Sequence, residues 1–89
     1  MNDHSKRLIE AVLNAICRYE VGMVSQEDLL RDIEGIGSAL EEKDIQIVVS
    51  NFAVKIDESR YLYGLEDGKQ FLSAEIQKLK AILGIKKAE

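Results

Sequence analysis

The sequence predicts an all-α protein, a single-domain bundle of four to five helices that spans residues 1–89 with short glycine-containing loops. Apolar residues recur at steps of three and four along most of the chain, which is the period of one helix face. Six glycines fall between these periodic segments, where glycine can end a helix, and there is no proline. The chain of 89 residues has room for one hydrophobic core.

The first helix is expected at residues 5–20. Gly22 follows it at the position where a left-handed residue often ends a helix. The steps of three and four place one apolar stripe on this helix, which predicts that it packs against the core along a single face. The residues of that stripe are Leu8, Ile9, Val12, Leu13, Ile16 and Tyr19.

A shorter second helix is expected at residues 26–34. Ser25 and Asp28 have the spacing of an N-terminal capping box, with Asp in place of the preferred Glu. The Gly35–Gly37 segment is expected to end this helix, because two glycines within three residues weaken helical structure.

The third and longest helix is expected at residues 38–62. Ser38 and Glu41 have the spacing of a full capping box at its start. Residues 45–49 are rich in β-branched side chains and are also compatible with a strand. Helix is favoured because the helical period continues beyond them and no second strand is available to pair. The apolar face consists of Ile45, Val48, Val49, Phe52, Ile56 and Tyr63.

This long helix also carries a second apolar stripe on the opposite side, with members spaced seven residues apart. A helix that is apolar on two sides is usually buried on both, so the favoured interpretation is a central helix packed between its neighbours. The alternative is that part of the stripe, especially near Tyr61, is an exposed partner-binding patch. The members of the second stripe are Leu40, Ile47, Val54 and Tyr61.

The last helix is expected at residues 67–83. Gly84 is expected to cap it, and Ile85 to pack back near Leu79. The lysines close to its end suit the negative pole of the helix dipole. Its apolar stripe consists of Phe71, Leu72, Ile76, Leu79, Ile82 and Leu83.

Charge is distributed unevenly. The chain has a net charge of −4, but residues 20–67 hold twelve acidic side chains against four basic ones, a net of −8. Such a segment repels phosphate backbones and attracts cations or a basic protein. The helix–glycine–helix arrangement resembles a DNA-binding helix-turn-helix, but its recognition helix would carry the wrong charge to meet phosphates. That helix would begin with Glu41, Glu42 and Asp44.

No residue pattern indicates catalysis, a metal or a cofactor. There is one His and one Cys; His4 is expected to be solvated and Cys17 to be a small buried side chain. Four zinc ligands at workable spacing are missing, and the Gly35–Gly37 segment lacks the remainder of a phosphate loop. The protein is therefore expected not to be an enzyme. The single thiol and the lack of a long apolar run favour a cytoplasmic protein without a membrane partner, and the acidic charge disfavours a nucleic-acid partner.

The layout resembles the small helical immunity proteins of bacterial toxin systems, both of the colicin type and of the contact-dependent growth-inhibition type. The segments that prompt it are VGMVSQEDLLRDIEGIG and KIDESRYLYGLEDGKQFLSAEIQKL, each a helix with an acidic junction that in the second segment is also aromatic. The resemblance implies one-to-one, non-catalytic neutralisation of the toxic domain of a cognate toxin. A nuclease fits the acidic charge, because its own active site must be basic. The alternative is an intracellular helical adaptor or small regulatory subunit.

For an immunity protein, the acid-rich junctions are the expected contact surface. The carboxylates would pair with Arg or Lys of the partner, and Tyr61 would be the apolar anchor. For Glu41 and Asp67, a role in helix capping is an equally simple explanation. The expected contact residues are Glu41, Glu42, Asp44, Asp57, Glu58, Tyr61, Glu66 and Asp67.

Overall fold

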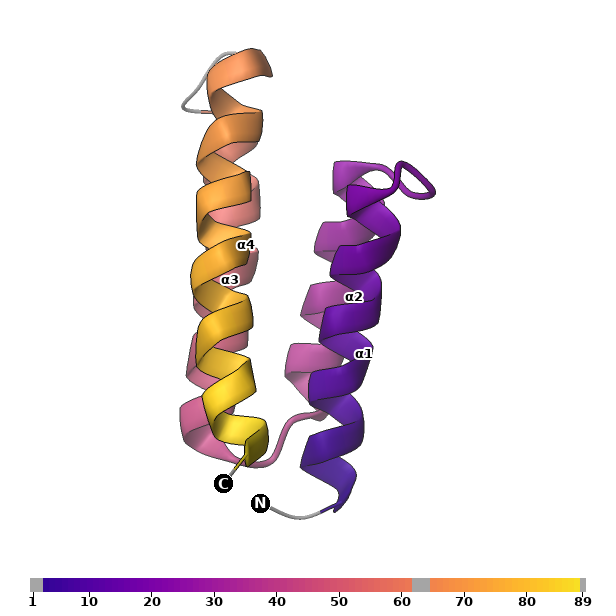
Figure 1. The fold of residues 1–89 in the computed structure, drawn as a ribbon, viewed down its shortest axis with the longest axis vertical. Helices are drawn as coiled ribbons and strands as arrows, with labels where there is room; N and C mark the ends of the chain where they lie inside the picture. Colours follow the sequence, from indigo (N-terminus) through magenta and orange to yellow (C-terminus); the bar gives the residue numbers. More distant parts are fainter. Residues whose placement is uncertain (1–2, 62–64, 89) are drawn as a thin grey trace.

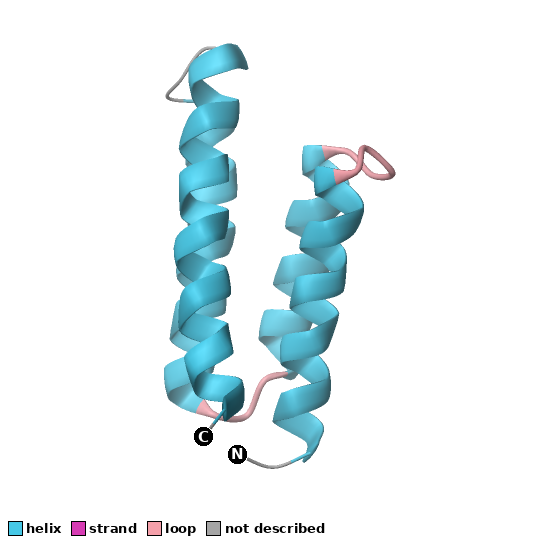
Figure 2. Ribbon diagram, in the orientation of Figure 1, coloured by secondary structure: helices cyan, strands magenta, loops and turns pink. Residues whose placement is uncertain are grey.

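The computed structural model describes residues 3–61 and 65–88, and within these ranges it contains helices and no strand (Figure 2). The helices are α1 (Asp3–Glu20), α2 (Gln26–Ala39), α3 (Lys43–Tyr61) and α4 (Leu65–Ala88). Figure 1 shows two hairpins, α1–α2 and α3–α4, that stand side by side with both chain ends at the same end of the bundle. The all-α prediction is confirmed with four helices, and the strand alternative for residues 45–49 is wrong.

Each of the four helices contributes one face to a shared aliphatic core. Most residues of the predicted faces are buried or partly buried, but Ile82 is 39% exposed, and Tyr63 lies outside the described residues. Burying one such side chain contributes about 1.5–3 kcal/mol, so this core is the main source of stability. The buried apolar residues are Ile9, Val12, Ala15, Ile16, Leu29, Ile33, Leu40, Ile45, Val49, Phe52, Ile56, Leu72, Ile76, Leu79 and Leu83.

The turn between α1 and α2 follows the local signals in the sequence. Gly22 has a φ of 82°, a left-handed conformation that glycine adopts without steric cost. The Met23 N–H donates to the Arg18 carbonyl at 2.8 Å and the Gly22 N–H to the Tyr19 carbonyl at 3.1 Å, which is the Schellman pattern. The predicted left-handed end of the first helix is confirmed.

The predicted capping box at the start of α2 is also confirmed. The Asp28 N–H donates to Ser25 Oγ at 3.2 Å, and the Ser25 N–H donates to Asp28 Oδ2 at 3.3 Å. Two backbone donors that the helix itself leaves free are therefore satisfied.

The glycines at positions 35 and 37 do not end α2, which continues to Ala39. Gly37 is buried, and a Cβ there would lie 3.5 Å from Val49 Cγ1, an ordinary van der Waals distance, so α2 and α3 pack directly against each other at this point. The capping box predicted at Ser38 is wrong, because Ser38 lies within α2 and its hydroxyl donates to the Glu34 carbonyl at 3.0 Å. Tertiary packing has overridden the local preference.

Gly84 does not end α4 either, since this helix runs through it to Ala88. Ile85 is 65% exposed instead of packing back near Leu79. Two lysines of the extra turn form ion pairs with other helices: Lys86 Nζ lies 2.8 Å from Asp44 Oδ2, and Lys87 Nζ lies 2.8 Å from Glu10 Oε1. These pairs hold the final turn of α4 against the bundle.

Replacing Gly35 or Gly84 by Ala should stabilise the protein. Both lie inside helices, and a Cβ at either position meets no atom within 4 Å. Each change should raise the free energy of unfolding by about 0.5–1 kcal/mol, measured by urea denaturation, because alanine loses less backbone entropy. As a control, Gly22→Ala should destabilise, since its φ of 82° strains any residue with a Cβ. Destabilisation by Gly84→Ala would contradict a continuous α4.

Candidate protein-binding face

An exposed apolar row runs along α3 and is formed by Ile47, Val54 and Tyr61. Their exposed fractions are 54%, 53% and 74%, respectively. Their spacing of seven residues places them on one side of the helix, opposite the buried face. The favoured interpretation of a central helix covered on both sides is therefore wrong, and the exposed alternative describes these three residues. Leu40, the fourth member of the stripe, is buried in the turn before α3.

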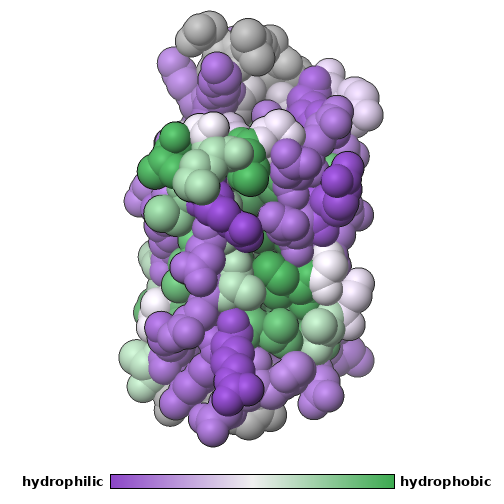
Figure 3. Space-filling view, turned by 90° about the vertical axis from the view of Figure 1, so that its right-hand side faces the viewer, coloured by the Kyte–Doolittle hydropathy of each residue, from purple (hydrophilic) through white to green (hydrophobic). Residues whose placement is uncertain are grey.

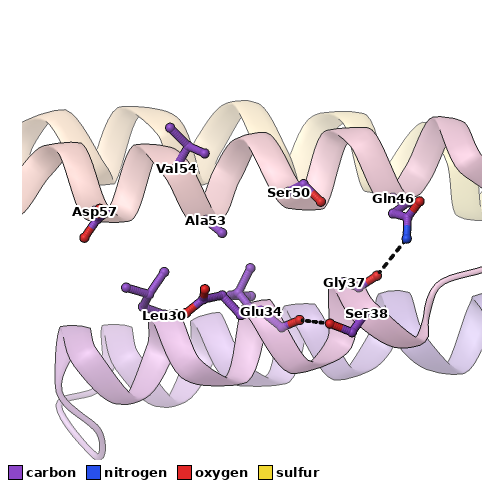
Figure 4. Close-up of a pocket in the computed structure, with 10 residues that line it drawn as sticks. Leu30, Glu34, Gly37, Ser38, Gln46, Ser50, Ala53, Val54 and Asp57 are labelled. Carbon is purple, nitrogen blue, oxygen red and sulfur yellow. Dashed lines mark hydrogen bonds between the residues drawn. The ribbon is translucent and has the colours of Figure 1, made fainter.

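A groove of about 600 Å³ lies beside this row, between α2 and α3 (Figure 4). Val54 belongs both to the apolar row and to the groove. The other side chains along the groove are mostly small or apolar, apart from one carboxylate on each helix, Glu34 on α2 and Asp57 on α3. Besides Val54 and the two carboxylates, the lining consists of Leu30, Ile33, Gly37, Ser38, Gln46, Ser50 and Ala53.

Polar contacts between α2 and α3 tie the groove at both ends. At one end, Gln46 Nε2 donates to the Gly37 carbonyl at 3.4 Å, as drawn in Figure 4. At the other end, Arg60 donates to Glu27 at 2.6 Å, and Gln26 donates to the Ile56 carbonyl at 3.1 Å. The two walls are therefore fixed relative to each other, so a partner meets a groove that is already formed.

The acidic middle section is partly neutralised by the protein's own cations. Among the described residues, six carboxylates of residues 20–67 form ion pairs, which weakens the expectation of a concentrated negative surface that follows from the net charge of −8. The pairs are Glu20–Lys80 at 2.7 Å, Glu27–Arg60 at 2.6 Å, Asp28–Arg31 at 3.7 Å, Asp32–Arg18 at 3.7 Å, Asp44–Lys86 at 2.8 Å and Glu58–Lys55 at 3.4 Å. Among the described residues, no ion pair involves Glu34 or Asp57, so the groove keeps its negative charge.

The eight expected contact residues do not form one surface. Glu41, Glu42 and Asp44 lie at the end of the bundle where α2 connects to α3. Asp57, Glu58, Tyr61 and Asp67 lie towards the opposite end, where α3 leads to α4. The offset of thirteen residues from Asp44 to Asp57 corresponds to about 20 Å along the helix. The side chain of Glu66 is outside the described residues.

The structure distinguishes four of these residues by the groups that surround them. Asp57 lines the groove, and Tyr61 belongs to the apolar row, with the Arg60 guanidinium 5.7 Å from the centre of its ring. Asp44 and Glu58 are paired with lysines of the same chain. Glu34, which lines the groove opposite Asp57, was missed at the sequence level because only the packing of α2 against α3 reveals it.

The ion pairs of α4 make stability depend on pH in the acidic range. The Lys86 ammonium, which donates to the Asp44 carboxylate, lowers the pKa of that carboxyl group below 3.8, assisted by the Ile45 N–H. Lys87 likewise lowers the pKa of Glu10 below 4.5. Both groups bind a proton less readily in the folded state than in the unfolded state.

The stabilisation from these two ion pairs should therefore be fully present above the pKa values that the carboxyl groups have in the unfolded chain. It should be lost as the pH falls through their lowered pKa values in the folded protein. Urea midpoints measured between pH 6 and pH 2.5 should decrease on acidification. The variant Lys86→Gln with Lys87→Gln should lose part of this decrease, because its carboxyl groups lack the cations that lower their pKa. An unchanged pH profile in this variant would contradict the proposed role of the two pairs.

The α1–α2 side of the molecule has both apolar and polar surface. Figure 3, which views the right-hand side of Figure 1, shows apolar surface between columns of polar side chains. Cys17 is exposed here beside Arg18 and Asp32, so its predicted burial is wrong. His4 is exposed as expected, with its ring nitrogen 3.4 Å from the Ala39 carbonyl.

Within residues 3–61 and 65–88, no group of three or more His, Cys, Asp or Glu side chains is arranged to hold a metal ion. No helix in these ranges has the length and hydropathy to cross a bilayer. Helices α2 and α3 lie side by side along their length (Figure 1), unlike the strongly crossed pair of a helix-turn-helix.

Comparisons with known protein families, curated protein sequences and solved structures found no match.

Proposed function

We propose that this protein is a non-catalytic immunity protein, which binds the toxic domain of a cognate bacterial toxin, a basic nuclease, through its α2–α3 face. The observation that carries the proposal is the exposed row Ile47, Val54 and Tyr61, which lies beside a groove whose two carboxylates form no ion pair among the described residues. Exposed apolar surface bordered by polar residues is typical of sites that contact another protein. An apolar centre with charged residues beside it is the usual composition of a protein interface.

The charge of this face indicates the kind of partner. Glu34 and Asp57 lie on opposite walls of the groove and are not neutralised by ion pairs within the described residues. A basic surface, such as the nucleic-acid site of a nuclease, would supply the complementary cations and would also associate faster. Covering such a site inhibits the nuclease without any reaction by the inhibitor.

The test begins with the neighbouring gene, because an immunity gene should directly follow the gene of a large toxin. The C-terminal domain of that toxin should stop growth when it is produced alone in a host. Co-production of this protein should restore growth, and the two purified chains should form a one-to-one complex. Lack of protection by the wild-type protein would contradict the immunity function. Binding without protection from toxicity would favour the adaptor alternative.

A further inference from the structure

We propose that the partner places a helix in the groove between α2 and α3, and that this helix carries basic residues on its two flanks, the sides that face α2 and α3. The inference rests on the proposed function and specifies which element of the partner binds. The groove is bounded on one side by α2 and on the other by α3, with Val54 joining it to the exposed apolar row. Packing a third helix onto two adjacent helices covers both the groove and the row, and this is a recurring way to recognise an amphipathic helix.

The length and period of the face fit a helix. The row from Ile47 to Tyr61 spans about 21 Å, which equals roughly four helical turns. Its members recur every seven residues, so a partner helix with apolar residues at the same spacing can meet all three. An extended strand, with its side-chain period of two, has no matching repeat on this face.

Small side chains allow the partner backbone to come close. Gly37 and Ser38 of α2 line the groove opposite Ser50 and Ala53 of α3. A groove lined by small residues accommodates the large side chains of an incoming helix, as knobs enter holes. The ties Gln46–Gly37 and Arg60–Glu27 fix the width of the groove before the partner binds.

The charges specify basic flanks and disfavour a second copy of this chain. Glu34 on α2 and Asp57 on α3 line the two walls, so a helix lying between them has one carboxylate available on each side. Lysine or arginine at the flanks of the helix would pair with both. Two copies meeting through this face would bring the same negatively charged carboxylates together, which is unfavourable.

The test uses displayed helical peptides of 21 residues as probes. Each peptide carries fixed leucines at a seven-residue spacing, while the flanking positions vary among Lys, Glu and Ser. Selection on the folded wild-type protein should enrich Lys at the flanks. Failure to enrich any peptide, or equal enrichment of Glu and Ser, would overturn the inference.

The enriched peptide should then bind at least about tenfold more weakly to the double variant Glu34→Gln with Asp57→Asn, because both flank contacts are lost. The matched control, Glu10→Gln with Glu20→Gln, has the same net charge but lies outside the groove. It should bind the peptide within about twofold of wild type. An equal loss in both variants would overturn the inference, since charge alone would then explain binding.

Two further outcomes separate this inference from the proposed function. Sedimentation of the protein alone should show a monomer, and a dimer that Val54→Arg dissociates would overturn the inference in favour of a second copy. If the toxin domain binds through the α2–α3 face while no helical peptide does, the inference fails and the proposed function stands. If helical peptides bind but the toxin domain does not, the proposed function fails.

Discussion

Replacing Val54 by Arg should weaken binding of the toxin domain by about a hundredfold or more, equivalent to about 2.7 kcal/mol, without unfolding the protein. Val54 is the middle residue of the exposed row and also lines the groove. A guanidinium there removes an apolar contact at the centre of the face and repels a basic partner. Isothermal titration calorimetry measures the loss of affinity, and circular dichroism establishes that the fold is intact.

The control for this prediction is Ile85→Arg, which introduces the same charge at an exposed aliphatic residue of α4. Ile85 is 65% exposed and lies outside the groove and the row. Its variant should bind the toxin domain nearly as tightly as wild type. If Ile85→Arg loses as much affinity as Val54→Arg, net charge rather than the α2–α3 face determines binding.

Replacing Ile56 by Ala should cost about 2–5 kcal/mol of unfolding free energy, because it removes buried methyl groups and leaves a cavity. Ile56 is fully buried on the inner side of α3. A domain of 89 residues has a total stability of about 4–13 kcal/mol, so this loss is a large part of it. Urea denaturation provides the measurement.

The matching variant on the outer side of the same helix is Val54→Ala. It should change the free energy of unfolding by less than about 0.5 kcal/mol, because Val54 is 53% exposed. The difference between the two variants tests directly whether α3 is covered on one side only. Similar losses at both positions would support the central, doubly buried helix that the sequence pattern favours.

Local signals predicted those parts of the fold that depend on neighbouring residues. Gly22 and the Ser25–Asp28 capping box act within one turn of chain, and both were predictable. The C-terminal ends of α2 and α4 were not, because α2 continues through Gly35 and Gly37 where it packs on α3, and the turn after Gly84 is held by ion pairs with distant helices. A single sequence does not show which glycine faces a neighbouring helix.

The candidate site was also predictable only in part, because it depends on contacts between helices as well as on local sequence. The seven-residue spacing identified the row, but a helical period shows only that α3 has two apolar sides and not which side is covered. The choice among carboxylates depends on ion pairs: Asp44 is paired with Lys86 of a distant helix and Glu58 with Lys55 of the same helix, while Asp57 is unpaired among the described residues. Glu34 joins the site only through the packing of α2 against α3.

Mapping of methyl and amide NMR shifts on adding the toxin domain is the most direct test of the α2–α3 face. The account predicts the largest changes at Ile47, Val54 and Tyr61 and along the groove near Glu34, with little change at the outer side of α4. Changes concentrated instead around Ile85, with Ile47 and Val54 unaffected, would contradict it.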